Sequence, residues 1–449
     1  MTVTGKRPTA IVMGAGVAGM AAAVRLADHG VAVTLLEATR RLGGRACSFP
    51  DKQSGFIIDN CPHVVLGCCG EMRSFLGRIG SADKINFTTR YYFSNNTGGV
   101  DILKPGILPA PLHFTGSMLL GIRFLTIREK TAIARAMLKI YRSKPGSYCD
   151  ISFAELLHKW KQPPGAVAKF WDFFIRSTCN APVQQVAAEY ALMVFRMAFL
   201  AGPKAAAMGI SETPLSETYK NVAAIIEKSQ GRVVTGKRVT GFSLDEEECL
   251  SAVITSKNKY KADIYISALP RQVLLQLSEK YLPRINSELK NAKFESSPII
   301  CAHLWFKQTV MPCPHLALPG KETEWIFDRT RNGEQGQYLC ALRSAADSWV
   351  KTSEDEIITK VMSDLREAFP GAAIEDPYRA RVIKEKRATF IPAPGLEKHR
   401  PDTFTNINNL FIAGDFCRTG WPATMESAVR SGNKAARAAI RYLSGKNGD

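Results

Sequence analysis

The spacing of apolar and polar positions in residues 9–45 predicts a strand, a glycine turn, a helix and a second strand. The apolar run TAIVM (9–13) comes before GAGVAG, and the alanine-rich stretch 20–30 ends at a glycine, which suits a helix C-terminus. Residues 31–36 form a short apolar run of the kind that a buried parallel strand shows. This order of elements predicts an α/β fold that begins with a parallel sheet.

The rest of the chain changes its pattern several times. Residues 60–210 are helix-rich and apolar, and prolines interrupt the uncharged stretch 105–122. From about 214 to 275 a helix is followed by short β-branched strands, and strands and helices mix from 276 to 400. A last strand, turn and helix follow over 409–443. The chain therefore ends with the same kind of unit with which it begins.

Composition and charge agree with a globular protein and narrow its partners. Of the 449 residues, 45% are apolar and 22% are charged, which is typical of globular domains. The formal net charge of +18 favours anionic partners such as a phosphate-bearing ligand or an acidic membrane surface. We expect no nucleic-acid binding, because the sequence contains no recognised module for it. Eleven cysteines form no CxxC pair, so we expect no metal site and a reducing, cytoplasmic location.

A glycine motif follows the first predicted strand. Gly14, Gly16 and Gly19 form GxGxxG, which permits a tight turn, close approach to a pyrophosphate and close packing of the helix on the sheet. The helix N-terminus offers unpaired N–H groups to the phosphates. Glu37 ends the second strand, where a carboxylate accepts both ribose hydroxyls and disfavours a 2′-phosphate. These residues predict a dinucleotide site.

Two further segments extend this predicted site. The segment RRLGGR (40–45) brings a glycine pair and two arginines, Arg41 and Arg45, towards a bound dinucleotide and its phosphates. Near the C-terminus, Gly414 and Asp415 follow the strand NLFIA, and WPATME opens the last helix. Because proline suits the first helical position, we expect that helix to begin near Pro422 and to direct its free N–H groups at the ligand.

Together these motifs resemble the FAD-dependent amine oxidase and phytoene desaturase superfamily. Within it, the chain is especially similar to the squalene-associated flavoenzymes of hopanoid biosynthesis, the hydroxysqualene dehydroxylases. The residues that carry this second resemblance are Ile58-Asp59-Asn60, His63, Leu66-Gly67, LPAPLHF (108–114), Asn180-Ala181-Pro182 and the run from Ala413 to Gly432. The resemblance implies a Rossmann-type FAD-binding domain with an interleaved mixed α+β substrate domain. The implied division is an FAD-binding domain of residues 1–60, 211–275 and 400–449 and a substrate, membrane-facing domain of residues 61–210 and 276–399.

The resemblance also implies which residues contact FAD. Val239 would read the adenine through its backbone, and Asp415 would meet the ribityl–pyrophosphate region. Thr424 and Met425 would face the pyrimidine edge of the flavin, where a helix N-terminus stabilises the negative charge of the reduced form. The full set of implied contacts is Gly14, Ala15, Gly16, Ala18, Gly19, Glu37, Arg41, Gly43, Gly44, Arg45, Val239, Gly414, Asp415, Thr424 and Met425.

The reaction that this resemblance implies is removal of the allylic hydroxyl group of hydroxysqualene, giving squalene by hydride transfer from reduced, non-covalently bound FAD. Hydroxide leaves poorly, so a donor should protonate it. His63 is the first candidate for this donor and Asp59 the second, because both belong to the motif near the front of the chain. The alternative for His63 is a structural role as the anchor of its turn. The sequence does not identify the electron donor that reduces FAD.

Two apolar regions fit a hydrophobic C30 isoprenoid substrate. Residues 180–209 are rich in Leu, Met, Phe and Ala, which predicts either an apolar substrate tunnel or ordinary core packing. Residues 122–144 carry seven basic residues and one acidic residue on an amphipathic pattern, directly after the stretch 105–122. We therefore expect peripheral contact with an anionic membrane, on the cytoplasmic face of the cell membrane, from which the substrate enters.

Two other functions share the scaffold that the resemblance implies. A carotenoid or phytoene-type desaturase uses the same cofactor to oxidise its substrate, and the motifs locate the cofactor without setting the direction of electron flow. A non-catalytic prenyl-lipid carrier would lack flavin chemistry, and the intact segments GGR (43–45) and PATMES (422–427) argue against it. Product analysis and flavin absorbance distinguish these alternatives.

Overall fold

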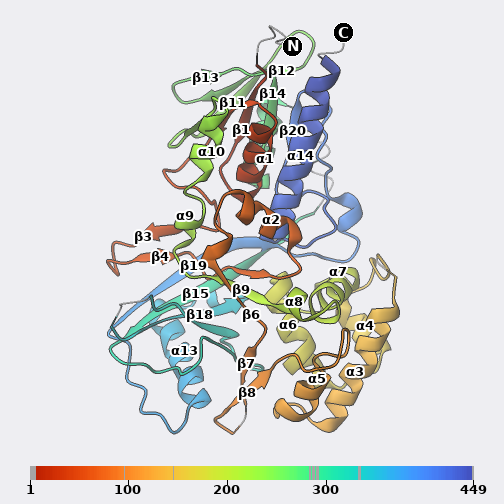
Figure 1. Ribbon diagram of the computed structural model, residues 1–449, viewed down its shortest axis with the longest axis vertical. Helices are drawn as coiled ribbons and strands as arrows, with labels where there is room; N and C mark the ends of the chain where they lie inside the picture. Colours follow the sequence, from red (N-terminus) through yellow and green to blue (C-terminus); the bar gives the residue numbers. More distant parts are fainter. Residues whose placement is uncertain are drawn as a thin grey trace.

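The two ends of the chain come together at one end of the molecule. Figure 1 shows helix α1 (Val17–Asp28) and helix α14 (Met425–Lys446) side by side there, with a larger sheet and a group of helices at the opposite end. The computed structural model describes residues 7–446 except 96, 145, 283, 284, 286–288, 290–292 and 332–334. Both predicted strand–turn–helix units therefore belong to one layered structure.

A five-stranded parallel sheet lies against these two helices. Its order is β10 (Arg232–Val234), β2 (Ala32–Leu36), β1 (Thr9–Met13), β14 (Ile264–Ser267) and β20 (Leu410–Ile412). Every residue of β14 and β20 is buried, as a parallel sheet that is covered on both faces requires. The predicted first strand and second strand are confirmed as β1 and β2, and β20 from the end of the chain completes the same sheet.

Helices cover one face of this sheet and a small second sheet covers the other. Where α1 and α14 cross, a Cβ on Gly432 would lie 2.2 Å from the carbonyl oxygen of Ala18, so glycine is needed for this close approach. On the other face, apolar residues pack against a three-stranded antiparallel sheet and one helix. These elements are β11 (Val239–Leu244), β12 (Leu250–Thr255), β13 (Lys259–Tyr260) and α11 (Arg271–Tyr281), whereas α10 (Val222–Lys228) packs beside α1.

The last helix begins later than the sequence predicts. We expected a start near Pro422, but α14 begins at Met425. The Thr424 side-chain oxygen accepts a hydrogen bond from the N–H of Ser427 (3.1 Å), so Thr424 caps the helix. The expectation from proline was wrong because this cap decides where the first turn begins.

A seven-stranded mixed sheet forms the centre of the other end of the molecule. Its order is β19 (Arg379–Phe390), β15 (Ser296–Phe306), β18 (Gln337–Ser344), β17 (Trp325–Asp328), β16 (His315–Ala317), β7 (Tyr91–Ser94) and β8 (Val100–Leu103). One face packs against α13 (Glu354–Ala368), through alternate residues of β15 such as Ile300 and Leu304. The other face packs against residues of the β4 region, including Ile58 and Cys61. This second face is the side of the sheet that is turned towards the dinucleotide-binding end.

The remaining elements form two small sheets and a helical group with an aromatic core. The small sheets contain β3 (Ser48–Pro50) and β4 (Ile57–Asp59), and β5 (Val64–Leu66), β9 (Met208–Ser211) and β6 (Ile85–Thr88). The helices of this group are α3 (Ile127–Arg142), α4 (Phe153–Lys159), α5 (Pro164–Ala166), α6 (Asp172–Cys179), α7 (Ala188–Val194) and α8 (Pro203–Ala206). Helices α2 (Gly70–Arg78) and α9 (Leu215–Thr218) instead contribute to the apolar core around α1 and α14. Within the described residues, every helix is too short or too polar to cross a bilayer.

The predicted α/β fold, with a Rossmann-type sheet and an interleaved mixed α+β part, is confirmed. The strands of the parallel sheet come from residues 9–36, 232–267 and 410–412, which lie inside the three segments assigned to the FAD-binding domain. The exact domain boundaries stay a prediction.

Candidate functional site

The turn between β1 and α1 presents an open helix N-terminus. The φ of Gly14 is +97°, and a Cβ on Gly19 would lie 1.9 Å from the Gly14 carbonyl oxygen, so this turn requires glycine at both positions. Gly16 is the N-cap of α1; no side chain among the described residues caps the helix, and a Cβ on Gly16 would meet nothing within 4 Å. The first-turn N–H groups, at the predicted contacts Ala18 and Gly19, are therefore left for an anionic ligand.

The carboxylate of Glu37, at the end of β2, is bonded to this turn. Its oxygens accept hydrogen bonds from the N–H groups of Ala15 (2.9 Å) and Thr39 (2.8 Å), and the side chain is buried. The Glu37 carbonyl oxygen accepts a hydrogen bond from the N–H of Lys237 (2.8 Å), two residues before Val239. The structure thus brings the predicted ribose-binding carboxylate and the predicted adenine-contacting valine to one edge of the glycine turn.

The RRLGGR segment crosses the same turn. The Gly43 N–H donates to the carbonyl oxygen of Ala15 (2.8 Å), and a Cβ on Gly44 would lie 3.1 Å from the backbone of the α1 N-cap. Gly44 also has a φ of +63°. Arg41 lies to one side, with its guanidinium over the ring of Phe49 at 5.3 Å. The glycine pair therefore borders the predicted pyrophosphate site directly, whereas the Arg41 side chain packs against the ring of Phe49.

Arg45 and Asp415 are in contact although they lie 370 positions apart in the sequence. Their side chains form a salt bridge of 2.7 Å, and the carboxylate raises the pKa of the guanidinium. Arg45 also donates to the carbonyl oxygen of Ala388 in β19 (2.6 Å). The N–H of Gly414 donates to the hydroxyl oxygen of Ser431 in α14 (2.9 Å). The predicted contacts at residues 45, 414 and 415 therefore meet where β19, β20 and α14 come together.

A buried arginine that the sequence analysis did not single out holds the C-terminal turn. The Arg400 side chain is fully buried and donates to the carbonyl oxygens of Asp415 (2.7 Å) and Trp421 (2.6 Å). It also forms an ion pair with Glu397 (2.6 Å), and Glu397 accepts a hydrogen bond from the hydroxyl of Tyr190 in α7. Nothing in the local sequence distinguishes Arg400 from the other lysines and arginines, because its partners come from three separate segments.

The residues present fit FAD. The uncapped N-terminus of α1 suits a pyrophosphate, and the buried carboxylate of Glu37 suits ribose hydroxyls. Thr424 and Met425 lie at the N-terminal end of α14, where the helix dipole favours the anionic edge of a reduced flavin. The contact of each of these residues with the cofactor stays a prediction.

His63 lies close enough to Arg45 to feel its charge. Its Nδ1 is 2.9 Å from the carbonyl oxygen of Cys61, and since a carbonyl only accepts, Nδ1 carries a proton. Burial, and secondarily the Arg45 guanidinium, lowers the pKa of His63. The neutral ring therefore predominates at neutral pH, and its Nε2 holds a lone pair that accepts a proton.

Asp59 is surrounded by hydrogen-bond donors. Its carboxylate accepts hydrogen bonds from the Ser48 hydroxyl (2.5 Å) and the Leu215 N–H (3.1 Å), and it pairs with Arg329 (3.3 Å). These contacts tie β4 to β3, to α9 and to the residue that follows β17. They give Asp59 a structural task, and its role as a proton donor stays a prediction.

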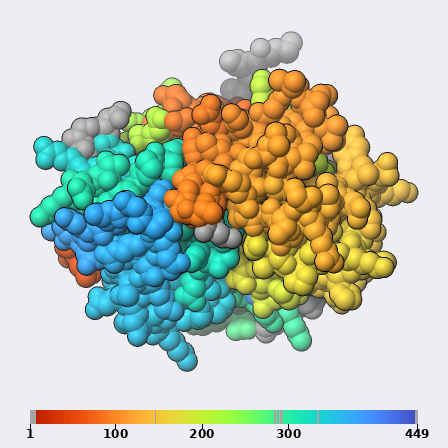
Figure 2. All heavy atoms as spheres, turned by 90° about the horizontal axis from the view of Figure 1, so that it is seen from below, coloured from red at the N-terminus to blue at the C-terminus, as the bar shows by residue number. Residues whose placement is uncertain are grey.

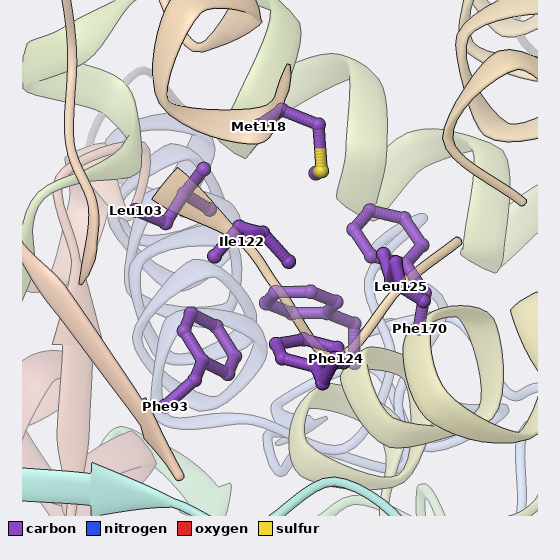
Figure 3. Close-up of a pocket in the computed structure, with 8 residues that line it drawn as sticks. Phe93, Leu103, Met118, Ile122, Phe124, Leu125 and Phe170 are labelled. Atoms are coloured by element: carbon purple, nitrogen blue, oxygen red, sulfur yellow. The ribbon is translucent and has the colours of Figure 1, made fainter. Parts of the chain in front are cut away.

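Aromatic packing accounts for much of the region in which the sequence predicts a substrate tunnel or a core. The rings of Phe195 and Phe199 pack against Trp171 and Phe174, each with centroids 4.9 Å apart. Beside them, apolar side chains surround a cavity of about 10 Å³, which is room for roughly one water molecule (Figure 3). Its lining comprises Phe93, Leu103, Met118, Ile122, Phe124, Leu125, Phe170 and Phe174. A tunnel for a C30 chain stays a prediction.

Proteins of known activity resemble the chain over nearly its whole length. It is 29% identical over 440 residues to a hydroxysqualene dehydroxylase of Zymomonas mobilis, a match that covers 96% of this chain and 99% of the relative. A hydroxysqualene dehydroxylase of Sinorhizobium fredii is 26% identical over 443 residues, covering 96% and 97%. A 15-cis-phytoene desaturase of an Oncidium hybrid is 23% identical over 458 residues, covering 97% and 78%.

Solved structures confirm the fold. An oxidoreductase from Methanosarcina mazei superposes with a TM-score of 0.72 at 18% identity, covering 96% of this chain and 100% of that one. Putrescine oxidase with bound putrescine gives a TM-score of 0.74 at 16% identity, covering 97% and 99%. Residues 17–440 match the model of the family described as "Flavin containing amine oxidoreductase". The predicted resemblance and the predicted cofactor, FAD, are thereby confirmed: the chain is a flavin-dependent oxidoreductase that belongs to the flavin containing amine oxidoreductase family.

Proposed function

We propose that this oxidoreductase removes the allylic hydroxyl group of hydroxysqualene and gives squalene. The similarity to two hydroxysqualene dehydroxylases carries the proposal, because it extends over 96% of this chain and so includes the cofactor site and the region around it. The substrate is a C30 isoprenoid, so burial of its apolar surface, at about 0.8 kcal/mol per CH₂, supplies most of the binding free energy.

The residues of the site divide into those that hold the cofactor and one that handles a proton. When bound and reduced, FAD supplies the hydride that replaces the hydroxyl group. The N-terminus of α1 and the carboxylate of Glu37 hold the dinucleotide, and the Arg45–Asp415 pair fixes the place where the two ends of the chain meet. The hydroxyl group of the substrate must also take up a proton before it leaves as water, and a side chain has to donate this proton.

His63 is the candidate for that proton. To donate from Nε2, it must first take up a second proton, because Nδ1–H already donates to the Cys61 carbonyl. The lowered pKa of His63 makes the imidazolium scarce at neutral pH. A proton-donor role therefore predicts a rate that rises as the pH falls.

A second candidate function, desaturation of a carotenoid-type polyene, is favoured by the same histidine. Nε2 of neutral His63 is a proton acceptor, which suits the loss of a proton from the substrate. The similarity to a 15-cis-phytoene desaturase also covers 97% of this chain. The two candidates thus require opposite starting protonation states of one side chain.

Anaerobic incubation distinguishes the two reactions. Holoenzyme with photoreduced flavin is mixed with hydroxysqualene, squalene is measured by mass spectrometry, and flavin reoxidation is followed by absorbance. We expect squalene to appear in step with reoxidation. Folded, yellow holoenzyme that produces neither contradicts the dehydroxylase proposal. A desaturated product from oxidised holoenzyme and phytoene would establish the second candidate instead.

We also propose that residues 105–142 form a membrane-docking surface, through which the substrate enters from the lipid. Large apolar side chains protrude there: Ile107, Leu120 and Ile127 are 103%, 88% and 70% exposed. In Figure 2 this segment, drawn in orange shades, forms a continuous part of the face that is seen from below. The other exposed apolar residues of the segment are Leu108, Leu112, Leu119, Leu138 and Tyr141. So many exposed apolar side chains in one segment favour an interaction surface.

The charge of this surface complements an anionic bilayer. Helix α3 buries Ile133 and Ile140 against the protein, while its outward side combines exposed apolar residues with basic ones. The exposed basic residues of the segment are Arg123, Arg128, Arg135, Lys139 and Arg142. Apolar insertion together with attraction to acidic headgroups is how amphipathic helices bind at a membrane interface. The negatively charged cytoplasmic face of the cell membrane is the partner that we propose.

Vesicle binding tests this surface. The holoenzyme is sedimented with vesicles of phosphatidylglycerol and phosphatidylcholine, and with phosphatidylcholine alone. We expect binding to the anionic vesicles, and a loss of at least tenfold when Ile107→Asp and Leu120→Asp are combined. Tyr378→Asp, at a residue that is 50% exposed outside the segment, is the control that should bind normally. Equal binding by all variants would contradict the docking surface.

A further inference from the structure

A cluster of metal-binding side chains lies on the face of the seven-stranded sheet that is turned away from α13. Cys301 and His303 are alternate residues of β15, so they share one face of the sheet. His303 is the direct cross-strand partner of Cys340 in β18, and Tyr338 lies two residues before Cys340 on the same face. Strand pairing thus gathers two thiols, an imidazole and a phenol from two segments of the chain.

The distances between the ligand atoms suit a small tetrahedral ion. The two sulfur atoms and the imidazole nitrogen all lie within 4.8 Å of one another. The Cys340 sulfur is 3.3 Å from Nδ1 of His303, and the Tyr338 hydroxyl oxygen is 2.7 Å from the same nitrogen. Zinc bonds of about 2.3 Å to sulfur and 2.0 Å to nitrogen place such ligands about 3.5 Å apart. Only small side-chain shifts separate the observed arrangement from a coordination shell.

We propose that Cys301, His303 and Cys340 bind one zinc ion, with the hydroxyl oxygen of Tyr338 in the fourth position. Binding releases the two thiol protons, and each thiolate forms a bond to the metal through its sulfur. No electron is transferred, because zinc has no redox chemistry in proteins. The ion joins the neighbouring strands β15 and β18 on the face that packs against Ile58 and Cys61.

Charge and burial select zinc among the soft cations. Cys301, His303 and Cys340 are each at most 1% exposed, so an uncompensated charge there would be costly. Two thiolates neutralise a dication, whereas they would leave a net negative charge around Cu⁺. Two sulfur ligands and a nitrogen ligand disfavour calcium and magnesium, which prefer oxygen. The donor set therefore indicates a closed, structural zinc site.

This inference goes against the expectation of no metal site that we drew from the sequence. That expectation depended on the absence of CxxC pairs, but strand geometry offers another way to bring ligands together. Cys301-x-His303 is a pair on one face of a strand, and its partner Cys340 is visible only once the register of β15 and β18 is known. The inference is independent of the proposed function, because none of these residues takes part in it.

Metal analysis of the holoenzyme tests the proposal. The protein is produced without a histidine tag, dialysed against a chelator, and analysed for metals by mass spectrometry. We expect about one zinc ion per chain, and an X-ray absorption spectrum at the zinc edge with two sulfur neighbours. Protein produced in cobalt medium should show cobalt bands at wavelengths longer than those of the flavin. Zinc-free wild-type protein, or a copper ion in its place, would overturn the assignment.

Variants locate the ion. Cys301→Ser and Cys340→Ser should each reduce the zinc content at least tenfold, while FAD content and circular dichroism report folding. Cys179→Ser, at another buried thiol, is the matched control and should keep its zinc. Undiminished zinc in both cluster variants would place the ion elsewhere, for example at Cys68 and Cys69, and would overturn the proposal. Should the cluster variants fail to fold, the zinc-edge spectrum of the wild type decides the ligand set.

Discussion

The dinucleotide-binding end and the seven-stranded sheet obtain their chemical groups in different ways. At the first, short segments carry their own geometry: the glycine turn, the carboxylate of Glu37 and the GGR segment meet through backbone hydrogen bonds such as that from Gly43 to Ala15. At the second, His303 and Cys340 meet only because two long strands pair in one register. A motif is therefore sufficient to locate the cofactor, whereas the chemistry of the sheet depends on tertiary structure.

A substitution within the glycine motif should change the protein most. In Gly19→Val, the new side chain would begin 1.9 Å from the Gly14 carbonyl oxygen, so the turn that is predicted to receive the pyrophosphate cannot close. We expect protein that retains less than about a tenth of the wild-type FAD, measured as the flavin-to-protein absorbance ratio. Gly77→Ala is the control, because nothing lies within 4 Å of that position in α2, and helix propensity there favours alanine by up to about 1 kcal/mol. A yellow Gly19→Val protein would show that FAD binding does not depend on the glycine turn.

The same contrast explains what the sequence could predict. The predicted strands and the glycine turn concern residues whose types and local spacing carry a mechanism, and the structure forms both. The salt bridge of Arg45 with Asp415 was not predicted, because these residues lie 370 positions apart. Arg400 could not be found in this way, because its partners are backbone carbonyl oxygens of distant segments, which every residue possesses. The start of α14 was misplaced because a side-chain cap outweighed the preference of proline for the first turn.

A second prediction concerns the junction between the two regions, at Arg400. Arg400→Met removes the hydrogen bonds to the C-terminal turn and leaves Glu397 without its ion-pair partner. Removing one member of a buried ion pair costs about 3–5 kcal/mol, and we expect a loss of this size in the free energy of unfolding, measured with urea on the holoenzyme. Arg418→Met is the control, since its ion pair with Asp402 is exposed and contributes about 0–1 kcal/mol. Equal losses in both variants would refute a special role for Arg400.

The third prediction concerns His63 and the reaction. If His63 donates the proton, His63→Gln should lower kcat/KM for hydroxysqualene about 100-fold, the lower end of the range for general acid catalysis. The wild-type rate should also fall as the pH rises above the lowered pKa of His63, and the variant should lose this dependence. His29→Gln is a matched control, because His29 also directs Nδ1 at a backbone carbonyl (2.9 Å) but is exposed. Loss of FAD or stability, with an unchanged pH profile, would indicate the structural role instead.

The last prediction concerns a buried carboxylate beside the seven-stranded sheet. Glu324 precedes β17 and accepts a hydrogen bond from the N–H of Ser344 (3.0 Å), and burial raises its pKa to about 7. Between about pH 4.5 and 7 the native state therefore holds a proton that the unfolded chain releases, so the contribution of this group to stability falls as the pH rises through that window. The pKa shift corresponds to a loss of at most about 3 kcal/mol in the stability of the wild type between low and high pH. A glutamine removes this pH dependence, but its unpaired amide NH₂ costs about 1–2 kcal/mol at every pH.

Glu324→Gln should therefore be less stable than the wild type by about 1–2 kcal/mol near pH 5 and more stable by about 1 kcal/mol near pH 8, measured by urea unfolding at both pH values. The control is Glu322→Gln, since Glu322 is half-exposed, pairs with Lys360 (3.0 Å) and has a lowered pKa, so its loss should not stabilise the protein at either pH. An equal difference at pH 5 and pH 8 would show that packing, and not the charge of Glu324, sets the effect. A gain confined to high pH would identify Glu324 as a carboxylate that the sheet buries at a cost in stability, while the buried carboxylate of Glu37 accepts two backbone N–H hydrogen bonds at the glycine turn.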